Sequence, residues 1–365
     1  MAGSTLGTIF KITTWGESHG RGIGVVIDGC PAGVALKEED IQIYLNRRKP
    51  GQSQYTTPRK EDDSVEILSG VFGGRTTGCP ISLLVLNENQ LSRDYSEIAG
   101  YYRPGHADFT FDEKYGFRDY RGGGRSSGRE TIGRVAAGAV AAKILEQLGI
   151  TVMAYTKSIG PVTIQSFDPE TITNNPLYMP DADAAKQAQN YLNDCMRKQD
   201  SSGGIIECRI SGMPTGIGDP VFEKLDANLA KAVLSVGAVK GFEIGDGFAA
   251  ATLRGSVNND SFYYDAQGNV KKRTNHSGGV LGGISDGDTI VFRAAIKPTP
   301  SISSQQNTVK KSGEDISVSI KGRHDPVIVP RAVVVVESMA ALTVLDALML
   351  NMTANIQGIC DFYHK

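Results

Sequence analysis

The segment RGGGRSSGRETIGRVAAGAVAAKILEQLG, residues 121–149, joins a glycine-rich loop to an alanine-rich stretch. The alanine-rich stretch predicts a helix over Glu130–Leu148, with Gly149 as its stop. The loop places arginines and two serines directly before the N-terminus of this helix. Free backbone N–H groups and the positive end of the helix dipole face such a loop, so the sequence predicts an anion site there. A disordered RGG-like patch or a simple N-cap is the alternative, and the ordered helix that follows argues against disorder.

Short alternating segments typical of strands lie on both sides of this helix. They are Gly24–Ile27, Val65–Leu68, Ile81–Leu86, Gly204–Ile210, Thr289–Ala295 and Ile316–Ile320. Further helices are predicted over Lys37–Arg47, Asp181–Lys198, Pro220–Val236 with Asp219 as N-cap, and Arg331–Asn355. The polar stretch from Pro161 to Pro180 is predicted to be an exposed excursion. Because strands and helices do not alternate regularly, we predict a single α+β domain over residues 1–365, with helices layered against antiparallel sheets.

The composition is typical of a soluble globular protein, with 40% hydrophobic and 21% charged residues. A net charge of −2 argues against a general nucleic-acid binder. The five cysteines form no CxxC pair and no metal-ligand spacing, which predicts no metal site and fits a reducing cytoplasm. Met1–Thr5 shows no signal-peptide pattern, and the longest apolar run, Ala332–Val336, is too short to span a bilayer. We therefore expect a cytoplasmic protein that binds neither nucleic acid nor membrane.

Three of the five histidines lie in short blocks rich in Gly, Pro, Arg or an acid. These blocks are GESHG (Gly16–Gly20), RPGHAD (Arg103–Asp108) and RHDP (Arg323–Pro326). Histidines from two or three such blocks would form a proton-transfer centre near neutral pH if the fold brought them together. Their cationic neighbours indicate a strongly anionic reactant.

Two further blocks could contact a ligand. Lys297–Ser301 offers a cation and hydroxyls on a proline-stiffened loop, and GGVLGGI (Gly278–Ile284) would let a flat ligand approach the backbone. The second block is not the dinucleotide fingerprint, because no strand–GxGxxG–helix pattern with its distant acid is present, and the sequence has no Walker A lysine.

The blocks together resemble the chorismate synthase family. The matching segments are Gly16–Pro31, Arg103–Phe111, Asp119–Thr131, Ala238–Phe248, Asn275–Ser285, Ile296–Ile302 and Gly322–Pro326. They follow the family's order and span most of the chain, so the set is far more specific than any one motif.

The resemblance implies a β-α-β sandwich fold and a lyase of the shikimate pathway of aromatic amino-acid biosynthesis. The reaction is the anti 1,4-elimination of phosphate and a C6 hydrogen from 5-enolpyruvylshikimate 3-phosphate, giving chorismate. The family requires reduced FMN although there is no net redox change. Substrate and FMN are polyanionic, and arginine forks pair with carboxylate and phosphate bidentately, which explains the arginine-rich motifs.

Site residues follow from the same resemblance, motif by motif. Substrate would be held by Arg48, Arg103, Arg129, Arg134 and Arg323. FMN would be held by Arg125, Ser126, Ser127, Gly237, Ala238, Gly282, Lys297, Pro298, Thr299, Pro300, Ser301 and Arg323. His19 would protonate the departing phosphate and His106 would protonate or hold the reduced flavin, and the reverse assignment fits the sequence equally well. Asp325 would assist proton removal through flavin N5.

The chain departs from the family pattern at Gln54, where an arginine is usual. The loss of a charged hydrogen bond costs roughly 1.5–3 kcal/mol and weakens the case for NADPH binding near Arg48. Some members reduce their own flavin with NADPH, and we expect this chain to depend on an external flavin reductase instead. The resemblance also implies a homotetramer.

Two other classes of function remain as alternatives. An RNA-binding module built on the RGGGR loop would need stacking aromatics and a basic face, and 7% aromatic content with a net negative charge argues against it. An ordinary flavin oxidoreductase would need a nicotinamide fingerprint, which the sequence lacks.

Overall fold

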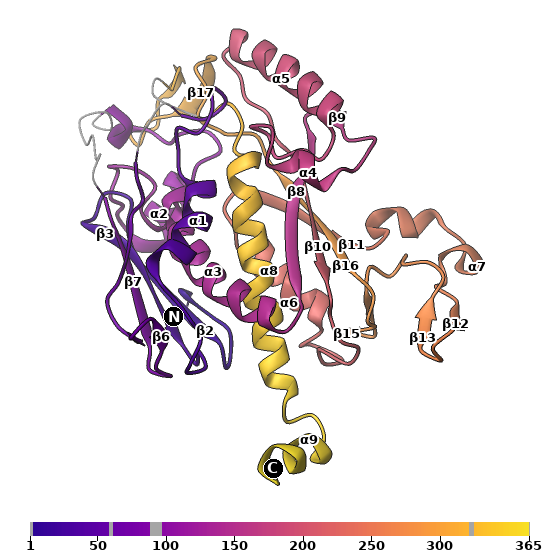
Figure 1. Cartoon of the computed structure of the whole chain (residues 1–365). Coiled ribbons are helices and arrows are strands. Elements are labelled where there is room, and N and C mark those ends of the chain that lie inside the picture. The colour runs from indigo at the N-terminus through magenta and orange to yellow at the C-terminus, as the bar shows by residue number, and fades with distance from the viewer. Residues whose placement is uncertain (1–2, 58–60, 88–96, 321–324, 365) are drawn as a thin grey trace.

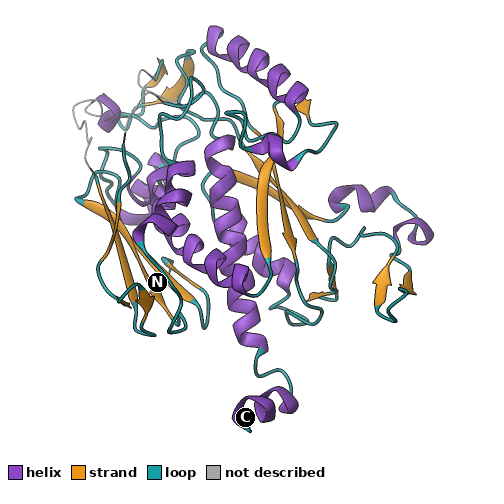
Figure 2. Ribbon diagram, in the orientation of Figure 1, coloured by secondary structure: helices purple, strands orange, loops and turns teal. Residues whose placement is uncertain are grey.

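Two five-stranded antiparallel sheets enclose a layer of helices in the computed structural model, which describes residues 3–57, 61–87, 97–320 and 325–364 (Figure 1). Figure 2 shows the sheets on either side of the central helices. The predicted α+β class and layered arrangement are confirmed. One cluster of buried apolar side chains runs from the first sheet through the helices to the second sheet.

The first sheet has the order β1-β2-β3-β7-β4. Its strands are β1 (Thr5–Leu6), β2 (Lys11–Gly16), β3 (Gly22–Asp28), β7 (Ile81–Leu86) and β4 (Val65–Ile67). Alternate residues of β3 and β7, such as Val25 and Leu83, pair in register and are buried beneath the helices. A small hairpin of β5 (Val71–Phe72) and β6 (Arg75–Thr76) lies beside it.

The second sheet has the order β11-β16-β10-β8-β9. Its strands are β11 (Val239–Ile244), β16 (Ile290–Ile296), β10 (Gly204–Ser211), β8 (Thr151–Ile159) and β9 (Val162–Thr163). Three two-stranded hairpins accompany the two sheets. They are β12 (Phe262–Tyr264) with β13 (Val270–Lys272), β14 (Val280–Leu281) with β15 (Ile284–Ser285), and β17 (Gln306–Val309) with β18 (Asp315–Val318).

The helix layer consists of α1 (Glu38–Arg48), α3 (Thr131–Gln147), α6 (Leu225–Leu234) and α8 (Val329–Asn351). Helices α1 and α3 pack on the first sheet, and α6 and α8 pack on the second. The remaining helices are α2 (Asp108–Tyr115), α4 (Pro169–Ile172), α5 (Ala182–Arg197), α7 (Gly255–Asn258) and α9 (Ile356–Tyr363). Short 3₁₀ turns occupy η2 (Glu97–Gly100), η3 (Gly124–Ser126), η4 (Gly128–Glu130) and η5 (Gly247–Thr252).

Helix α8 is the core helix of this layer. By length and composition alone it could cross a membrane, and 67% of its most apolar window is buried inside the protein. Its single buried acid, Glu337, accepts two hydrogen bonds from Arg47 at 2.6 and 2.9 Å. The sequence expectation considered only the uninterrupted run Ala332–Val336, whereas the whole helix is apolar and most of it is packed inside the protein.

Three sequence predictions about elements are wrong in part. Helix α6 begins at Leu225, because Val221 has a left-handed φ of +67° and the backbone N–H of Leu225 donates to Gly283 O at 2.8 Å. The predicted Arg331–Asn355 helix ends at Asn351, and Asn355 instead caps α9. The excursion from Pro161 to Pro180 is not wholly exposed, since it buries three apolar side chains, those of Ile172, Leu177 and Met179.

Candidate active site

The loop that precedes α3 is held to the first sheet and to α6 by two arginines. Arg125 donates to Thr14 Oγ1 at 2.7 Å and to Gly16 O at 3.1 Å, and lies 3.6 Å from Glu130. Arg134 shares the Glu130 carboxylate at 2.7 Å and donates to Ser235 Oγ at 2.5 Å. Both guanidinium groups therefore compensate one carboxylate, Glu130, at the first turn of α3.

The two serines of this loop make local hydrogen bonds. Ser126 Oγ donates to Gly123 O at 2.6 Å, and Ser127 Oγ accepts from the backbone N–H of Arg129 at 3.3 Å. Ser127 thus serves as an N-cap of the short turn that leads into α3. The loop has the geometry of a helix N-terminus, as the sequence predicts.

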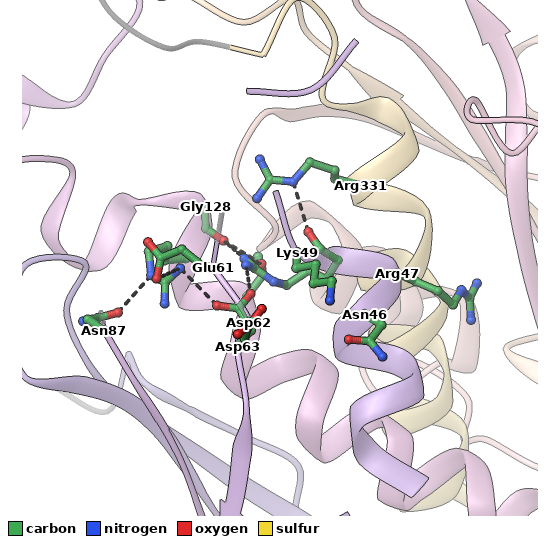
Figure 3. A network of polar contacts seen from close by, with 12 residues as sticks. Asn46, Arg47, Lys49, Glu61, Asp62, Asp63, Asn87, Gly128 and Arg331 are labelled. Carbon is green, nitrogen blue, oxygen red and sulfur yellow. Dashed lines mark hydrogen bonds and ion pairs between the residues drawn. The ribbon is translucent and has the colours of Figure 1, made fainter. Parts of the chain in front are cut away.

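Arg48 and Arg129 meet at one buried carboxylate, that of Asp63 (Figure 3). Arg48 Nη2 lies 2.6 Å from Asp63 Oδ2, and Arg129 Nη1 lies 3.1 Å from Asp63 Oδ1. Arg129 Nη1 is also 3.1 Å from Glu61 Oε2, and Arg48 Nη1 donates to Gly128 O at 3.2 Å. The C-terminus of α1 and the start of α3 are joined by this cluster.

Burial sets the electrostatics of this pair of arginines. It lowers the pKa of Arg48 to about 10, against the opposite effect of the Asp63 carboxylate. Burial alone would raise the pKa of Asp63, but Arg48 and Arg129 outweigh it and hold that pKa below its ordinary value. Asp63 also has a φ of +49°, a left-handed backbone conformation that is strained for a non-glycine residue. The fold therefore maintains a strained, buried anion between two candidate substrate arginines.

Asn87 connects this cluster to the loop that carries His19. Its Oδ1 accepts from Arg129 Nε at 2.9 Å, and its Nδ2 donates to Glu17 O at 2.9 Å and to Gly20 O at 2.8 Å. The His19 ring lies against Gly122, where a Cβ atom would be 2.5 Å from Nδ1 and where φ is +127°. Only glycine fits there, so the glycine loop before α3 directly contacts His19.

His106 belongs to a second pair of docked loops. Its Nε2 is 2.8 Å from Ser301 Oγ, and Lys297 Nζ donates to Gly105 O at 2.8 Å. Gly105 has a φ of +71°, and a Cβ there would be 2.8 Å from Pro300 Cβ. The two loops, far apart in sequence, are thus held in direct contact.

Arg103 stabilises the His106 loop from within. Its side chain donates to Asp108 at 2.8 and 2.7 Å, and both residues are buried. Burial would raise the pKa of Asp108, but the hydrogen bonds and charge of Arg103 hold it below its ordinary value. Two nitrogens of this guanidinium, Nε and Nη2, therefore bind Asp108 at the base of the loop.

The Lys297–Ser301 loop also contacts the segment that follows α6. The backbone N–H of Lys297 donates to Ala238 O at 2.9 Å, and Ala238 has a left-handed φ of +73°. Gly237 lies two residues after Ser235, which binds Arg134. Gly237 and Ala238, which follow α6, therefore lie beside Lys297, which follows β16. The sequence analysis predicted all three as FMN residues. Pro298 is exposed on the surface of this loop.

Asp325 joins the Arg48 cluster to the Lys297–Ser301 loop. It accepts from Arg331 Nη1 at 2.7 Å and from the backbone N–H of Thr57 at 2.7 Å, and Arg331 Nε donates to Arg48 O at 3.0 Å. On its other side, Pro326 O accepts from the backbone N–H of Ser202 at 2.9 Å. Ser201 Oγ in turn donates to Thr299 O at 2.7 Å. Together with the contacts of Arg125, Arg134, Asn87 and His106 described above, these contacts link the loops in a ring. We call this set of loops the site ring, and it comprises Gly16–Gly20, Arg103–Asp108, Gly122–Arg129, Ser235–Ala238, Lys297–Ser301 and Asp325 with their partners Arg48, Asp63, Asn87 and Arg331.

A cavity of about 300 Å³ lies beside the site ring at Arg331. It is lined mainly by uncharged polar side chains, among them Gln52, Ser53, Thr56 and Tyr178. Tyr178 Oη and Gln52 Oε1 are 3.4 Å apart across it. The cavity therefore lies next to Arg331, the arginine that donates to Asp325.

Two predicted site residues are not assigned to the site ring. Arg323 lies outside the described residues. Gly282 is in the β14–β15 turn, near the start of β16, whereas Lys297 follows its other end. Strand β16 has seven residues and spans about 20 Å. Within one chain, Gly282 and the Lys297–Ser301 loop therefore lie at opposite ends of this strand.

The sequence analysis did not identify the residues that hold the arginines in place. These are Glu61, Asp63, Asn87 and Arg331. Glu61 and Asp63 follow the RRKPGQ turn within a charged stretch of the sequence. Only their burial in the folded protein distinguishes them from surface acids. No local pattern marked Asn87.

Polar atoms that face the site ring test whether it fits FMN. Thr299 Oγ1 and Arg129 Nη2 are buried and have no hydrogen-bond partner within the described ranges. A hydroxyl on the Lys297–Ser301 loop suits the phosphate and carbonyl oxygens of a flavin nucleotide, and the Arg129 N–H suits an anionic oxygen of the substrate for which the resemblance names this arginine. Part of the predicted set therefore fits the cofactor.

Comparison with known proteins identifies the family. The family model described as chorismate synthase matches residues 10–349. The curated chorismate synthases of Agathobacter rectalis and Lachnoclostridium phytofermentans are 70% and 66% identical, with 100% of each chain covered. A chorismate synthase crystal structure superposes with a TM-score of 0.77 at 30% identity, over 98% of this chain and 97% of the other. The chain therefore belongs to the chorismate synthase family.

Proposed function

We propose that the site ring is where this lyase converts 5-enolpyruvylshikimate 3-phosphate to chorismate. The observation that supports the proposal is the unbroken series of contacts from the His19 loop through Arg129, Arg48 and Asp325 to Ser301 and His106. The series links motifs that are distant in sequence, as a site for a polyanionic substrate requires.

Arg129 is the described arginine best prepared to bind substrate. Its Nε and Nη1 are held by Asn87, Glu61 and Asp63, which fixes the plane of the guanidinium. Its Nη2 is buried and has no hydrogen-bond partner in the part of the chain that the structure describes. A carboxylate or phosphate oxygen would satisfy that donor with a charge-assisted hydrogen bond.

The other substrate arginines would act from behind Arg129. Arg48, Arg103 and Arg134 are paired with Asp63, Asp108 and Glu130 respectively. These pairs keep positive charge near the site at a tolerable desolvation cost, because each charge is compensated when the substrate is absent. Arg323 is proposed as a further ligand of substrate and of FMN.

His19, His106 and Asp325 are proposed to move protons. His106 is oriented by Ser301 and His19 by the glycine loop at Gly122. One imidazolium would protonate the departing phosphate and the other would hold the reduced flavin protonated, with either assignment consistent with the sequence. Asp325, fixed by Arg331 and Thr57, is proposed to accept the C6 proton through flavin N5.

FMN is proposed to bind between the loop before α3 and the Lys297–Ser301 loop. Arg125, Ser126 and Ser127 would line one side, where their side chains bind Thr14, Gly123 and Arg129 and the backbone N–H groups of Ser126 and Ser127 donate to Gly123 O and Gly124 O. Gly237, Ala238 and Thr299 would line the other side. When bound, reduced FMN supplies the electron that allows phosphate to leave without net redox change.

The test is an anaerobic assay with 5-enolpyruvylshikimate 3-phosphate and chemically reduced FMN. We expect equimolar chorismate and phosphate. His19→Ala and His106→Ala should each lower turnover by about 10²–10⁴ while the fold is retained, as expected when an acid–base group is removed. Wild-type turnover in either variant would remove that histidine from the mechanism. An ordinary flavin oxidoreductase would instead consume reductant in proportion to product.

The cellular setting is also proposed. The chain would act in the cytoplasm as a homotetramer and would receive reduced FMN from a separate flavin reductase. Gln54 replaces the arginine usual in the family, and it donates to the hydroxyl of Tyr55 at 2.7 Å. An assay with oxidised FMN and NADPH alone should therefore give no chorismate, and adding a flavin reductase should restore it.

A further inference from the structure

The proposed reaction does not use the cavity beside the site ring. This cavity has a volume of about 300 Å³ and is lined by the loop that follows α1, the loop that follows α4 and the first turn of α8. Pockets for small molecules range from about 300 to 1,000 Å³. The cavity is at the lower limit of this range, so it suits a small metabolite rather than a nucleotide such as FMN.

The charged groups on the cavity wall are arginines whose partners lie outside the lining. Among the described residues that line the cavity are Arg47 and Arg331 and no acid. Arg47 is paired with Glu337 at 2.6 Å, and Arg331 is paired with Asp325 at 2.7 Å. These pairs leave little net charge at the cavity, so a tri-anion such as 5-enolpyruvylshikimate 3-phosphate is a poor match there. A ligand with a single negative charge is a better one.

Arg331 keeps a donor for such a charge. Its Nη1 donates to Asp325 at 2.7 Å, and its Nε donates to Arg48 O at 3.0 Å. Its Nη2 makes no hydrogen bond within the part of the chain that the structure describes. A carboxylate in the cavity would accept a charge-assisted hydrogen bond from this nitrogen.

The uncharged part of the wall can bind hydroxyl groups. Gln52 Nε2 donates to Arg47 O at 2.9 Å and to Lys49 O at 2.7 Å, which fixes Gln52 Oε1 as an acceptor. Tyr178 Oη lies 3.4 Å from this oxygen, which is long for an O–H···O hydrogen bond. Burial raises the pKa of Tyr178, so its hydroxyl remains a donor at neutral pH. Both groups therefore have capacity for a hydroxylated ligand.

The loop that carries Tyr178 is held firmly in a strained conformation. Tyr178 has a left-handed φ of +54°. Asn175 fixes the loop, because its Oδ1 accepts from the backbone N–H groups of Leu177 and Met179 at 3.1 and 3.3 Å. The side chains of Leu177 and Met179 are buried beneath it. Strained residues of this kind cluster at ligand clamps, and this one lines the cavity.

We propose that the cavity binds a small hydroxylated monocarboxylate, with the carboxylate on Arg331 and hydroxyl groups on Gln52 and Tyr178. Arg331 also holds Asp325, the proposed proton acceptor, so a bound carboxylate competes for the guanidinium that orients it. The ligand therefore lowers turnover without entering the substrate site. This regulatory effect rests on the proposed function, whereas the binding itself does not.

The first test is calorimetric titration of the full chain without FMN or substrate. The probe is D-gluconate, which carries a carboxylate and several hydroxyl groups. D-Sorbitol lacks the carboxylate and acetate lacks the hydroxyl groups, so each removes one half of the expected recognition. We expect gluconate to bind about tenfold more tightly than either compound, because a charged hydrogen bond contributes to its affinity alone or with the hydroxyl contacts. Absence of gluconate binding, or equal affinities for all three compounds, would overturn the proposal.

Variants of the wall locate the binding. Thr173 lines the cavity outside the site ring, so Thr173→Trp fills part of the space, and gluconate affinity should fall about tenfold or more. Thr163→Trp, at an exposed position of β9 outside the lining, is the control and should bind as the wild type does. Tyr178→Phe keeps the ring and removes one hydrogen bond, which should weaken binding about threefold. Full affinity in both Thr173→Trp and Tyr178→Phe would contradict the assignment to this cavity.

Steady-state kinetics test the regulatory effect in the anaerobic assay. Saturating gluconate should lower kcat of the wild type about fivefold and leave KM unchanged, whereas Thr173→Trp should be insensitive. A rise in KM alone would mean that gluconate enters the substrate site, and an unchanged kcat would mean that the cavity does not act on Asp325. Either result would overturn the regulatory role. Gluconate binding by a chain that forms no chorismate would instead refute the proposed function and leave the cavity assignment in place.

Discussion

The single buried carboxylate of Asp63 compensates the positive charges of two guanidinium groups, those of Arg48 and Arg129. Its pKa lies below the ordinary 3.8 because Arg48 and Arg129 outweigh the effect of burial. A carboxyl whose pKa is lowered by folding stabilises the native state above its unfolded pKa. That stability is lost as the pH falls through the folded value. The pair Asp63 and Asp108 should therefore make the protein increasingly unstable below about pH 4.

Asp63→Asn tests this account directly. Removing one partner of a buried ion pair costs about 3–5 kcal/mol, so we expect urea unfolding at pH 7 to give a free energy lower by about 3 kcal/mol. The difference from wild type should shrink as the pH falls below 4. Asp62→Asn, at the exposed neighbouring position, is the control and should change neither value. A loss that is the same at all pH values would contradict the role of the charge.

Asn87 positions both Arg129 and the loop of His19. Asn87→Ala removes hydrogen bonds to Arg129 Nε, Glu17 O and Gly20 O, so we expect weaker substrate binding. A charged hydrogen bond is worth about 1.5–3 kcal/mol, which corresponds to a rise in KM of about tenfold or more. Steady-state kinetics of chorismate formation would measure it, with the exposed Asn46→Ala as control. Unchanged KM and turnover would show that the Asn87 bridge is not needed.

At this scale the sequence predicted the cations better than their partners. The proposed site arginines stand in Gly-, Pro- and His-rich blocks that are visible in the sequence, so they could be named from it. Asp63 and Asn87 become meaningful only when β4 and β7 bring them beneath α3, and such long-range burial leaves no local pattern.

Between elements, the crossing of α3 and α8 depends on one glycine. A Cβ atom at Gly138 would lie 2.2 Å from Ser338 Cβ, so no side chain fits between the two helices. Gly138→Ala would gain helix propensity but must push α8 away, and overpacking costs about 1–3 kcal/mol. We expect a net loss of stability in urea unfolding. Gly255→Ala, where the added Cβ meets nothing within 4 Å, should be nearly neutral. Equal stability of both variants would mean that the helices separate without cost.

Elements with a strong local signal were predicted well. The alanine-rich α3 and the amphipathic α5 agree with the expected ranges to within one or two residues. Strands β2, β8 and β11 were missed, although Ile12, Thr13 and Thr14 of β2 are residue types that favour strands. Their pairing with β3, β10 and β16 decides their conformation, and that pairing is non-local.

Over the whole molecule, the site ring draws on both sheets and on the helix layer between them. The His19 loop follows β2 of the first sheet, and the Lys297–Ser301 loop follows β16 of the second. Composition and spacing give no distance between such loops, so only the family resemblance brought them together before the structure did. The role of Gly282 stays a prediction, because the motif is present while one chain places it at the other end of β16.

A site built across both layers predicts that the layers unfold together. The chain has one tryptophan, Trp15 on β2, so its fluorescence reports on the first sheet alone. A Trp15→Phe/Phe167→Trp variant moves the reporter to the second sheet, where Phe167 packs on Tyr155 with ring centroids 5.0 Å apart. If the continuous core makes the chain a single domain, both reporters and far-UV circular dichroism should give the same urea midpoint. Separate midpoints for the two reporters would mean that each sheet, with its own helices, is a unit that unfolds alone. The prediction of one domain over residues 1–365 would then be wrong, and the site ring would lie between two domains.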